Sequence, residues 1–441
     1  MTTPDCPSNF HCEDKPYTEW FRKPWRERMA FVEDMVREIS LQTDPQAMVK
    51  VYSERMMKIL PSDQRISLSR RDLQFPFVRV TRVETDELNL NPWKHRDSLP
   101  VLRGGLLADL IYAEKPTIIE DLKLAEDDPS RKYLEGIRSL CVLPMFDQGS
   151  SLNMVVLGRK DNGFSHEFMP ENLWLSNLFG RATANLVLKE QLREAYGRVD
   201  RELKIVADIQ RSLLPTELPQ IPGLDIAAYY QTSMHAGGDY YDFFHLPGGK
   251  IGMLIADVSG HGTPAAVVMA VTHSIAHTHD GDPDPPSKLL NFINRHLAAR
   301  YTNGTGTFVT AFYGIFDPAT RELRFANAGH NPPRLKRGRG GPNGIIEGEA
   351  NLPLGINETE LYVDSVQRLH PGDILVLYTD GITEARAPDH ELFGTDRLDE
   401  VINQSEHSSQ ELIDETLIRV ERFTNYGPVT DDRTMLVIQF S

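Results

Sequence analysis

The chain has 441 residues, of which 40% are hydrophobic and 25% charged, a composition and length that suit two or three ordinary globular domains. Its formal net charge of −16 disfavours a nucleic-acid-binding surface, and no apolar run approaches the roughly 18–20 residues that cross a bilayer. Three cysteines do not form a disulfide framework, so we expect a cytoplasmic protein that binds neither nucleic acid nor membrane.

The N-terminal part of the chain predicts a polar leader followed by a mixed helix-and-strand domain. The leader, residues 1–27, contains Pro, Asp and Ser with few aliphatic side chains. Hydrophobic periodicity then predicts helices at 26–40, 44–60, 105–113 and 128–136, strands at 78–83, 116–119, 139–145 and 153–158, and helix again from 168.

This order of elements resembles a GAF domain over about residues 28–190. The resemblance rests on the strands R-S-L-C-V-L-P-M and V-V-L-G and on the helix E-N-L-W-L-S-N-L-F-G-R-A-T-A-N. It implies an α/β sensor domain, and the same elements also fit an α+β domain that only dimerises. No residue indicates a particular ligand, and Cys141 lies in mid-strand, where we expect a core residue rather than an attachment site.

A long helix is predicted over 179–214. From Leu192 its apolar residues recur in alternating steps of four and three, at 192, 196, 199, 203, 206 and, after the polar Gln210, 213. This seam predicts a parallel homodimer, although a single helix that packs its stripe on a neighbouring domain has the same pattern. Gly197 weakens the helix by about 1 kcal/mol relative to alanine. Prolines at 215, 219 and 222 end the helix, which makes 191–222 a linker before a domain at 223–441.

The C-terminal domain is predicted to be α+β with antiparallel sheets. We expect strands at 226–230, 251–257, 307–316, 322–328, 361–369, 373–378 and 435–440, helices at 263–279, 287–300 and 411–424, and a turn at 379–384. These strands do not alternate one by one with helices, which favours antiparallel over parallel pairing. Thr263 and Pro264 predict the cap and the first residue of the helix that follows A-D-V-S-G-H-G.

Four aspartates carry the chemistry predicted for this domain: Asp239, Asp257, Asp380 and Asp431. Each lies in a turn-like stretch at or near a strand end. One such aspartate alone is more often a turn residue, but four together, without cysteine, suit a hard cation that prefers oxygen ligands. Clustered carboxylates repel one another unless cations neutralise them. Since Mg²⁺ keeps several waters and Mn²⁺ also accepts oxygen ligands, two ions of either kind can share four aspartates.

Six motifs, in this order, closely resemble the SpoIIE/RsbU branch of the PPM (PP2C-like) serine/threonine phosphatases. They are G-G-D-Y-Y-D-F-F, A-D-V-S-G-H-G, N-A-G-H-N-P-P, L-P-L-G-I, Y-T-D-G-I-T-E-A and T-D-D-R-T. The match covers about residues 200–441 and includes the entry segment I-Q-R-S-L-L-P-T-E-L-P-Q-I-P-G. It implies a β-sandwich flanked by helices, with a site for two Mn²⁺ or Mg²⁺ ions at one edge.

The resemblance also implies a role for each ligand. Asp257 would bridge both ions, and the Val258 carbonyl would complete one of them. Asp239 would bind one ion directly or through water, while Asp380 and Asp431 would hold the other. Asp239 and Asp257 are therefore the expected catalytic residues. Asp432, next to Asp431, is the less favoured member of the pair.

The implied reaction is hydrolysis of phosphoserine or phosphothreonine. A water that bridges two cations has a lowered pKa and attacks the phosphorus in line. The implied substrate is a phosphorylated STAS-type anti-sigma-factor antagonist in a partner-switching pathway. His261 and His330 either protonate the leaving alkoxide or hydrogen-bond within their turns. We expect the N-terminal domain to regulate activity by shifting helix 263–279 or segment 210–222.

Alternative functions are weaker on the sequence. Gly237-Gly238-Asp239 resembles the start of the diguanylate cyclase signature, but two tyrosines follow instead of Glu-Phe. D-V-S-G-H lacks both glycines of the G-x-S-x-G hydrolase motif. A non-catalytic scaffold would bind its partner without metal and hydrolyse nothing. The basic residues Arg334, Lys336, Arg337 and Arg339 are typical of a solvated hairpin tip, or else form a dock for an acidic phosphoprotein.

Overall fold

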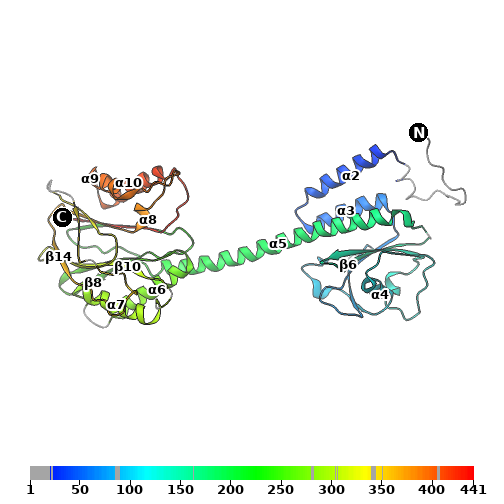
Figure 1. Ribbon diagram of the computed structural model, residues 1–441, viewed down its shortest axis with the longest axis horizontal. Coiled ribbons are helices and arrows are strands. Elements are labelled where there is room, and N and C mark those ends of the chain that lie inside the picture. Colours follow the sequence, from blue (N-terminus) through cyan, green and yellow to red (C-terminus); the bar gives the residue numbers. More distant parts are fainter. Residues whose placement is uncertain are drawn as a thin grey trace. The chain divides into compact units, whose positions relative to one another are not determined.

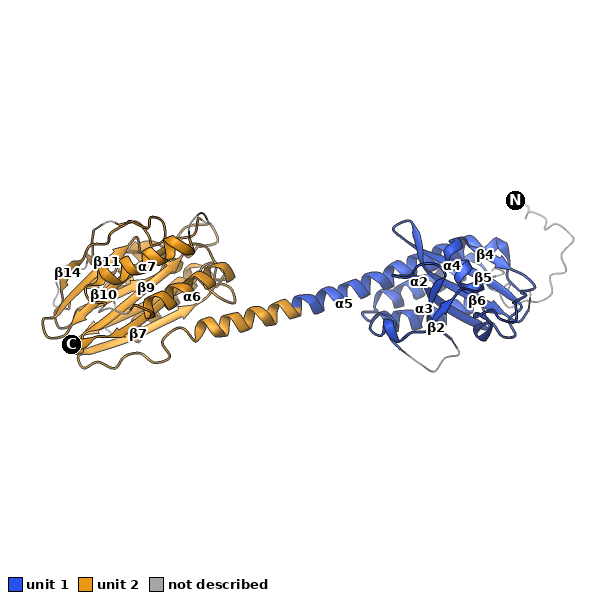
Figure 2. Cartoon of the chain, turned by 90° about the horizontal axis from the view of Figure 1, so that it is seen from below, with its two compact units in different colours: residues 1–196 blue, residues 197–441 orange. Residues whose placement is uncertain are grey.

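The computed structural model describes residues 20, 23–84, 90–161, 163–279, 283–302, 304, 306–338, 344–349, 351–404 and 408–441. The chain divides into two compact units, residues 1–196 and 197–441, which Figure 2 colours separately. The division falls inside one long helix, α5 (Met169–Arg211). The predicted leader lies almost wholly outside the described residues. Within the described part of the chain, no helix is both long and apolar enough to span a membrane.

The N-terminal unit is built on a six-stranded antiparallel sheet in the order β3-β2-β1-β6-β5-β4. The strands are β1 (Gln64–Ser69), β2 (Phe77–Val83), β3 (Val101–Arg103), β4 (Thr117–Ile119), β5 (Ser139–Asp147) and β6 (Ser150–Arg159). One face carries α3 (Pro45–Ile59) and the start of α5, with α2 (Trp25–Ser40) beside α3, and the other face carries α4 (Leu106–Ala113) (Figure 1).

The two faces of this sheet differ in chemistry. In β1, Ile66 and Leu68 join the aliphatic core under α4. The alternate residues Arg65, Ser67 and Ser69 point to the opposite face, towards α3 and α5. The period of two that makes β1 a strand therefore also makes one of its faces polar, although both faces are covered by helices.

The C-terminal unit is a sandwich of two five-stranded antiparallel sheets, as predicted. The first, in the order β14-β11-β10-β9-β8, contains β8 (Tyr240–His245), β9 (Ile251–Val258), β10 (Val309–Asp317), β11 (Glu322–Ala328) and β14 (Ser365–Arg368). The second, in the order β13-β12-β15-β16-β7, contains β7 (Leu224–Gln231), β12 (Arg334–Lys336), β13 (Gly344–Ile345), β15 (Ile374–Tyr378) and β16 (Arg433–Phe440).

Helices cover both outer faces of the sandwich (Figure 1). The first sheet carries α6 (Thr263–His277) and α7 (Pro286–Arg300), and the second carries α8 (Asp380–Thr383), α9 (Gly394–Gln404) and α10 (Ser409–Phe423). The interior is apolar, and Phe316 packs on Phe440 across it with ring centroids 4.8 Å apart. Each such fully buried side chain contributes about 1.5–3 kcal/mol of hydrophobic stabilisation. This core fixes the two sheets against each other and so fixes the edge where the aspartates lie.

Several predicted elements were wrong in detail. Segment 128–136 contains only a 3-10 turn, Arg131–Tyr133, segment 361–369 is a strand only at Ser365–Arg368, and the predicted turn 379–384 contains the helical turn α8. Gly262, with a φ of +75°, caps α6 in place of Thr263, because the chain enters the helix in a conformation that glycine adopts without strain. Strands β1, β3 and β8 and helix α9 were not predicted, and the helix predicted from 168 and the long helix predicted over 179–214 form one element, α5.

Candidate active site

The first half of the candidate site lies where β8 begins and β9 ends. Their antiparallel register pairs Tyr240 with Ala256, so the next pair outward places Asp239 opposite Asp257. Directly opposed residues project to the same face of a sheet, here the interior of the sandwich. The two carboxyl groups are close enough for repulsion from Asp239 to raise the pKa of Asp257.

The second half lies on the facing sheet, where β15 ends and β16 begins. Tyr378 pairs with Met435, so the residues just beyond these strand ends, Asp380 and Asp431, lie near each other. Both carboxylates interact electrostatically with Asp257. The fold thus brings all four predicted aspartates together at one edge of the sandwich.

Two threonines hold Asp239 in place across the sandwich. Asp239 is only 1% exposed, and its Oδ2 accepts hydrogen bonds from Thr379 Oγ1 at 2.8 Å and from Thr434 Oγ1 at 2.6 Å. The Thr434 amide in turn donates to Thr379 Oγ1 at 2.9 Å. One oxygen of Asp239 is therefore fixed by protein donors, which leaves Oδ1 for another partner. The sequence analysis missed both threonines, although each lies within three residues of a predicted aspartate.

Asp432 holds the loop that leads into β8. It accepts hydrogen bonds from the amides of Ser233 at 2.7 Å and Gly238 at 2.6 Å. A Cβ at Gly238 would lie 2.8 Å from the carbonyl oxygen of Val258, so glycine lets this loop approach that carbonyl closely. The carbonyl predicted as a ligand therefore lies beside the loop that positions Asp239.

The end of α5 fastens the same loop. The Gly237 amide donates to Gln210 Oε1 at 3.0 Å, and Gln210 Nε2 donates to the Gly237 carbonyl. Earlier in α5, Asp200 also contacts this loop, because its Oδ1 lies 3.0 Å from His235 Nε2. By the periodicity of the helix alone, Gln210 is a polar interruption of the apolar seam. The structure shows that its amide, only 4% exposed, binds the backbone two residues before Asp239.

Burial makes the charged state of these carboxyl groups costly. Burial, followed by repulsion from Asp239, Asp380 and Asp431, raises the pKa of Asp257 to about 10. Burial likewise raises the pKa of Asp239 to about 8, against the opposing effect of the two threonine hydroxyls. The pKa of Asp380 rises to about 6, chiefly through burial and then through Asp431. At pH 7, Asp257 and Asp239 are therefore largely neutral unless a cation compensates their charge, whereas Asp380 is mostly ionised.

The four aspartates fit divalent cations. Within the described residues, no Lys or Arg forms an ion pair with any of them. Uncompensated buried carboxylates cost several kcal/mol each, and oxygen-only donors are the ligands of Mg²⁺ and Mn²⁺. Exposed Glu384, which raises the pKa of both Asp380 and Asp431, adds a fifth carboxylate that the sequence analysis did not predict.

The two predicted histidines differ in their surroundings. His261 is exposed and interacts electrostatically with Asp431. His330 is buried, with its Nδ1 2.8 Å from Thr310 Oγ1 and its amide donating to Asn327 Oδ1 at 2.8 Å. Burial lowers the pKa of His330 to about 4, so its imidazole is neutral near pH 7. Of the two, His261 is the better placed to donate a proton.

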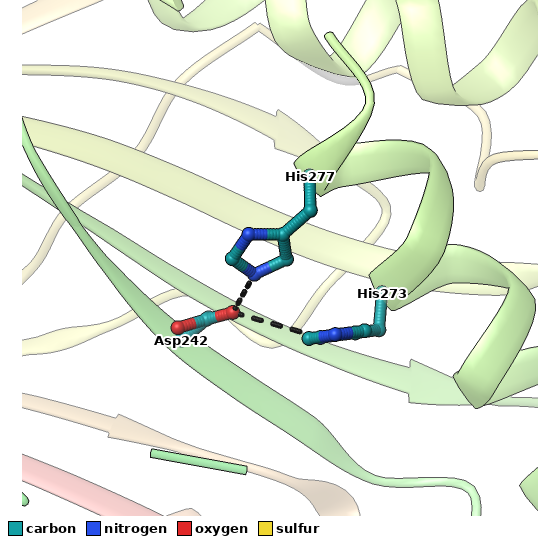
Figure 3. A group of neighbouring side chains, drawn as sticks. All are labelled: Asp242, His273 and His277. Carbon is teal, nitrogen blue, oxygen red and sulfur yellow. Dashed lines mark hydrogen bonds and ion pairs between the residues drawn. The ribbon is translucent and has the colours of Figure 1, made fainter. Parts of the chain in front are cut away.

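A second carboxylate–imidazole group lies on the other face of β8, between this strand and α6 (Figure 3). His277 Nε2 is 2.7 Å and His273 Nδ1 3.8 Å from Asp242 Oδ2. That carboxylate also accepts from the Tyr240 hydroxyl at 2.6 Å and from the Phe243 amide at 2.7 Å. Protein donors therefore satisfy both oxygens of Asp242, and the group links β8 to α6. The sequence analysis did not predict it.

The basic residues of the β12 segment make ion pairs within the C-terminal unit. Arg337 Nη1 lies 2.7 Å from Asp373 and Arg334 Nε 3.3 Å from Asp399. Arg339 lies outside the described residues. These pairs favour a structural role for the two described arginines over a dock for an acidic protein.

The sequence has relatives among known phosphatases. The family Stage II sporulation protein E (SpoIIE) matches residues 247–441. The phosphoserine phosphatase RsbU of Bacillus subtilis is 30% identical over 257 residues, which cover 57% of this chain and 73% of RsbU. Protein IcfG of Synechocystis is 26% identical over 279 residues, covering 57% of this chain and 43% of IcfG, so the match spans less than half of that relative. The solved SiaA-PP2C domain of Pseudomonas aeruginosa aligns with 20% identity and a TM-score of 0.49 over 56% of this chain and 99% of that domain.

A helix-flanked sandwich with a carboxylate cluster at one edge, together with these sequence relatives, defines a phosphatase domain. The match to RsbU, 30% identical and covering 73% of that protein, identifies the family of the phosphatase. The chain belongs to the SpoIIE family of phosphatases, the group that includes RsbU.

Proposed function

We propose that the chain is a metal-dependent protein phosphatase that hydrolyses phosphoserine or phosphothreonine on a signalling protein. One observation carries the proposal: four aspartates from two facing sheets meet at one edge of the sandwich, and no described Lys or Arg pairs with them. Such a donor set would hold two Mn²⁺ or Mg²⁺ ions, through the carboxylates of Asp239, Asp257, Asp380 and Asp431 and the carbonyl of Val258.

Each part of the site has a task in this reaction. When bound, the cations would lower the pKa of water and stabilise charge on the phosphoryl oxygens. Thr379 and Thr434 fix the orientation of Asp239, so its carboxylate does not need to reorganise during the reaction. Exposed His261, beside Asp431, is positioned at the edge of the site to donate a proton to the departing serine or threonine oxygen.

The substrate we propose is a phosphorylated STAS-type anti-sigma-factor antagonist in the cytoplasm. Support comes from the family, since the relative RsbU is named a phosphoserine phosphatase. Support also comes from the position of the carboxylates at a sandwich edge, where Asp380 and Asp431 are partly exposed. A side chain on the surface of a folded protein reaches such a site without unfolding.

Turnover of para-nitrophenyl phosphate and of a phosphoserine peptide by the full chain tests this function. We expect activity with Mn²⁺ or Mg²⁺ and none with EDTA. Asp257→Asn and Asp239→Asn should each lower kcat by at least about 100-fold, because each removes a charge aligned on the reacting group. Asp414→Asn, an exposed aspartate of α10, is the matched control and should leave kcat unchanged. No turnover from either the full chain or residues 200–441 would instead indicate a non-catalytic scaffold.

We further propose that the N-terminal unit regulates this site through α5. Support comes from the hydrogen bonds between Gln210 and Gly237, because they connect the last turn of α5 to the loop that positions Asp239. A change in the position or packing of α5 would then alter the binding of cations at Asp239. Removal of residues 1–190 should change kcat, and equal activity and oligomeric state in both proteins would contradict the proposal.

A further inference from the structure

The N-terminal unit encloses a cavity of about 600 Å³ between its sheet and the helices α3 and α5. This volume is in the range of sites for small organic molecules, about 300–1,000 Å³. The opposite face of the sheet, under α4, is instead filled by aliphatic side chains such as Ile66, Leu107 and Val156. The two covered faces of one sheet thus differ: one is packed and the other is hollow.

The cavity has a strong excess of positive charge. Its charged lining consists of six arginines and one aspartate, Asp147, which pairs with Arg71. Two of the arginines, Arg65 on β1 and Arg79 on β2, are each only 8% exposed. A sheet face that only had to support helices would carry aliphatic residues at these positions, because burial of a guanidinium without a partner is costly.

The buried arginines lack the partners that would compensate this cost. The Nε atoms of Arg65 and Arg79 are buried without a hydrogen-bond partner among the described residues. Arg79 makes one long hydrogen bond, from Nη1 to the Arg71 carbonyl at 3.5 Å. Exposed Glu84 interacts with Arg65 electrostatically but forms no ion pair with it in the described part of the chain. Both guanidinium groups therefore have donors available to an anion inside the cavity.

The wall beside Arg65 is apolar. In the register of β1 with β6, Arg65 pairs with Leu157, and Ser67 pairs with Val155. Leu157 belongs to an aliphatic cluster that continues onto β5, and on the helix side the rings of Tyr52 and Phe179 stack 3.7 Å apart. A molecule that satisfies both walls has an anionic group for the guanidinium and a compact apolar body for the leucine and aromatic side chains.

We propose that this cavity binds a small organic acid, with its carboxylate on Arg65 and its apolar body against Leu157 and Phe179. The planar guanidinium donates two parallel hydrogen bonds to a carboxylate, which fixes the orientation of the acid. The site lies within the N-terminal unit, and the proposal does not depend on the phosphatase activity. It assigns a ligand class to the unit that we propose as regulatory.

Tryptophan fluorescence offers a direct test, because all four tryptophans, Trp20, Trp25, Trp93 and Trp174, belong to the N-terminal unit. Benzoate is the probe, and benzamide, its neutral analogue, is the comparison at equal ionic strength. We expect benzoate, and not benzamide, to raise the midpoint of the fluorescence-monitored thermal unfolding of the full chain in a saturable way. Equal shifts with both compounds would mean that the cavity binds through apolar contacts alone and does not recognise the carboxylate, which would overturn the proposal. No shift with either compound would also overturn it.

Substitution of Arg65 gives a second, independent readout. Arg65→Met should weaken benzoate binding by about tenfold or more, because a hydrogen-bonded ion pair is lost. Without benzoate, the same variant should unfold at an equal or higher temperature, because an uncompensated buried charge has been removed. A lower midpoint with unchanged benzoate affinity would instead make Arg65 a structural residue. Arg138→Met, which removes an exposed arginine paired with Asp121, is the control and should leave benzoate binding unchanged.

Discussion

At the level of single residues, the imidazole of His330 makes the stability of the C-terminal unit depend on pH. Its pKa falls from the ordinary 6.5 to about 4 because the ring is buried. Above pH 6.5 the ring is neutral in both the folded and the unfolded chain, so it has no effect on the pH dependence. As the pH falls below 6.5, the unfolded chain binds a proton that the folded chain does not, and the folded state loses stability.

The size of this effect can be measured by comparison with His330→Gln, which has no titrating group. We expect the difference in unfolding free energy between wild type and variant to shrink by about 2 kcal/mol from pH 7.5 to pH 5. The measurement is urea unfolding followed by far-UV circular dichroism. All four tryptophans belong to the N-terminal unit, so the transition that tryptophan fluorescence does not detect is assigned to the C-terminal unit. A difference that stays constant across this pH range would show that His330 is not held neutral in the folded protein.

The residues of the site were predictable to different degrees from the sequence. Asp257 lies at the end of the apolar strand β9 and Asp380 lies two residues beyond the apolar strand β15, so their positions near strand ends could be inferred from local pattern. The hydroxyls of Thr379 and Thr434 could not, because they reach Asp239 across the sandwich, 140 and 195 residues away in sequence. Contacts between sheets depend on how the sheets pack, and no period within one strand encodes that packing.

At the level of elements, the last turn of α5 and the loop before β8 act as one structural unit. The side chain of Gln210 hydrogen-bonds both the amide and the carbonyl of Gly237. The amide of the next residue, Gly238, donates to Asp432 Oδ2 at 2.6 Å. Helix periodicity predicted α5 as an apolar stripe, and on that basis Gln210 was an interruption. The hydrogen-bond partner of Gln210 lies 27 residues further along the chain, so the periodicity of the helix could not predict this contact.

Substitution of this glutamine tests the connection between helix and site. Gln210→Leu leaves the amide and carbonyl of Gly237 buried without partners, which costs about 1–3 kcal/mol for each group. We expect the loop to move, kcat to fall about tenfold, and the Mn²⁺ concentration for half-maximal activity to rise. Glu202→Leu, at an exposed position of the same helix, is the matched control. Unchanged metal dependence in Gln210→Leu would mean that the hydrogen bonds do not position Asp239.

Strands and helices with a regular period were predicted well, whereas short or irregular ones were not. The antiparallel pair β5 and β6 carries long apolar runs around a turn, and its prediction is confirmed. By contrast, β8 was not predicted, because the neighbouring side chains of Tyr241 and Asp242 point to opposite faces of the sheet and both are buried. A strand in which tyrosine and aspartate are buried does not show the apolar alternation that identifies a half-buried strand.

At the level of the whole molecule, α5 carries an apolar stripe that is exposed within the described residues. Leu192, Tyr196 and Val199 occupy successive seam positions and are 52%, 68% and 53% exposed. Their alternating spacing of four and three residues matches the geometry of a helix that packs against a copy of itself. The parallel homodimer through this helix remains a prediction, and the three exposed residues are the positions that it requires.

Sedimentation of the full chain over a range of concentrations tests this prediction. A charge at a dimer seam loses the burial of one apolar side chain in each copy, about 1.5–3 kcal/mol apiece. Leu192→Glu combined with Tyr196→Glu should therefore raise the dimer dissociation constant by at least about 100-fold. Arg201→Glu changes the charge of an exposed residue on the side of the helix away from the seam and should leave the dimer intact. A wild-type chain that sediments as a monomer at every concentration would contradict the homodimer, and regulation through α5 would then have to operate without a second copy.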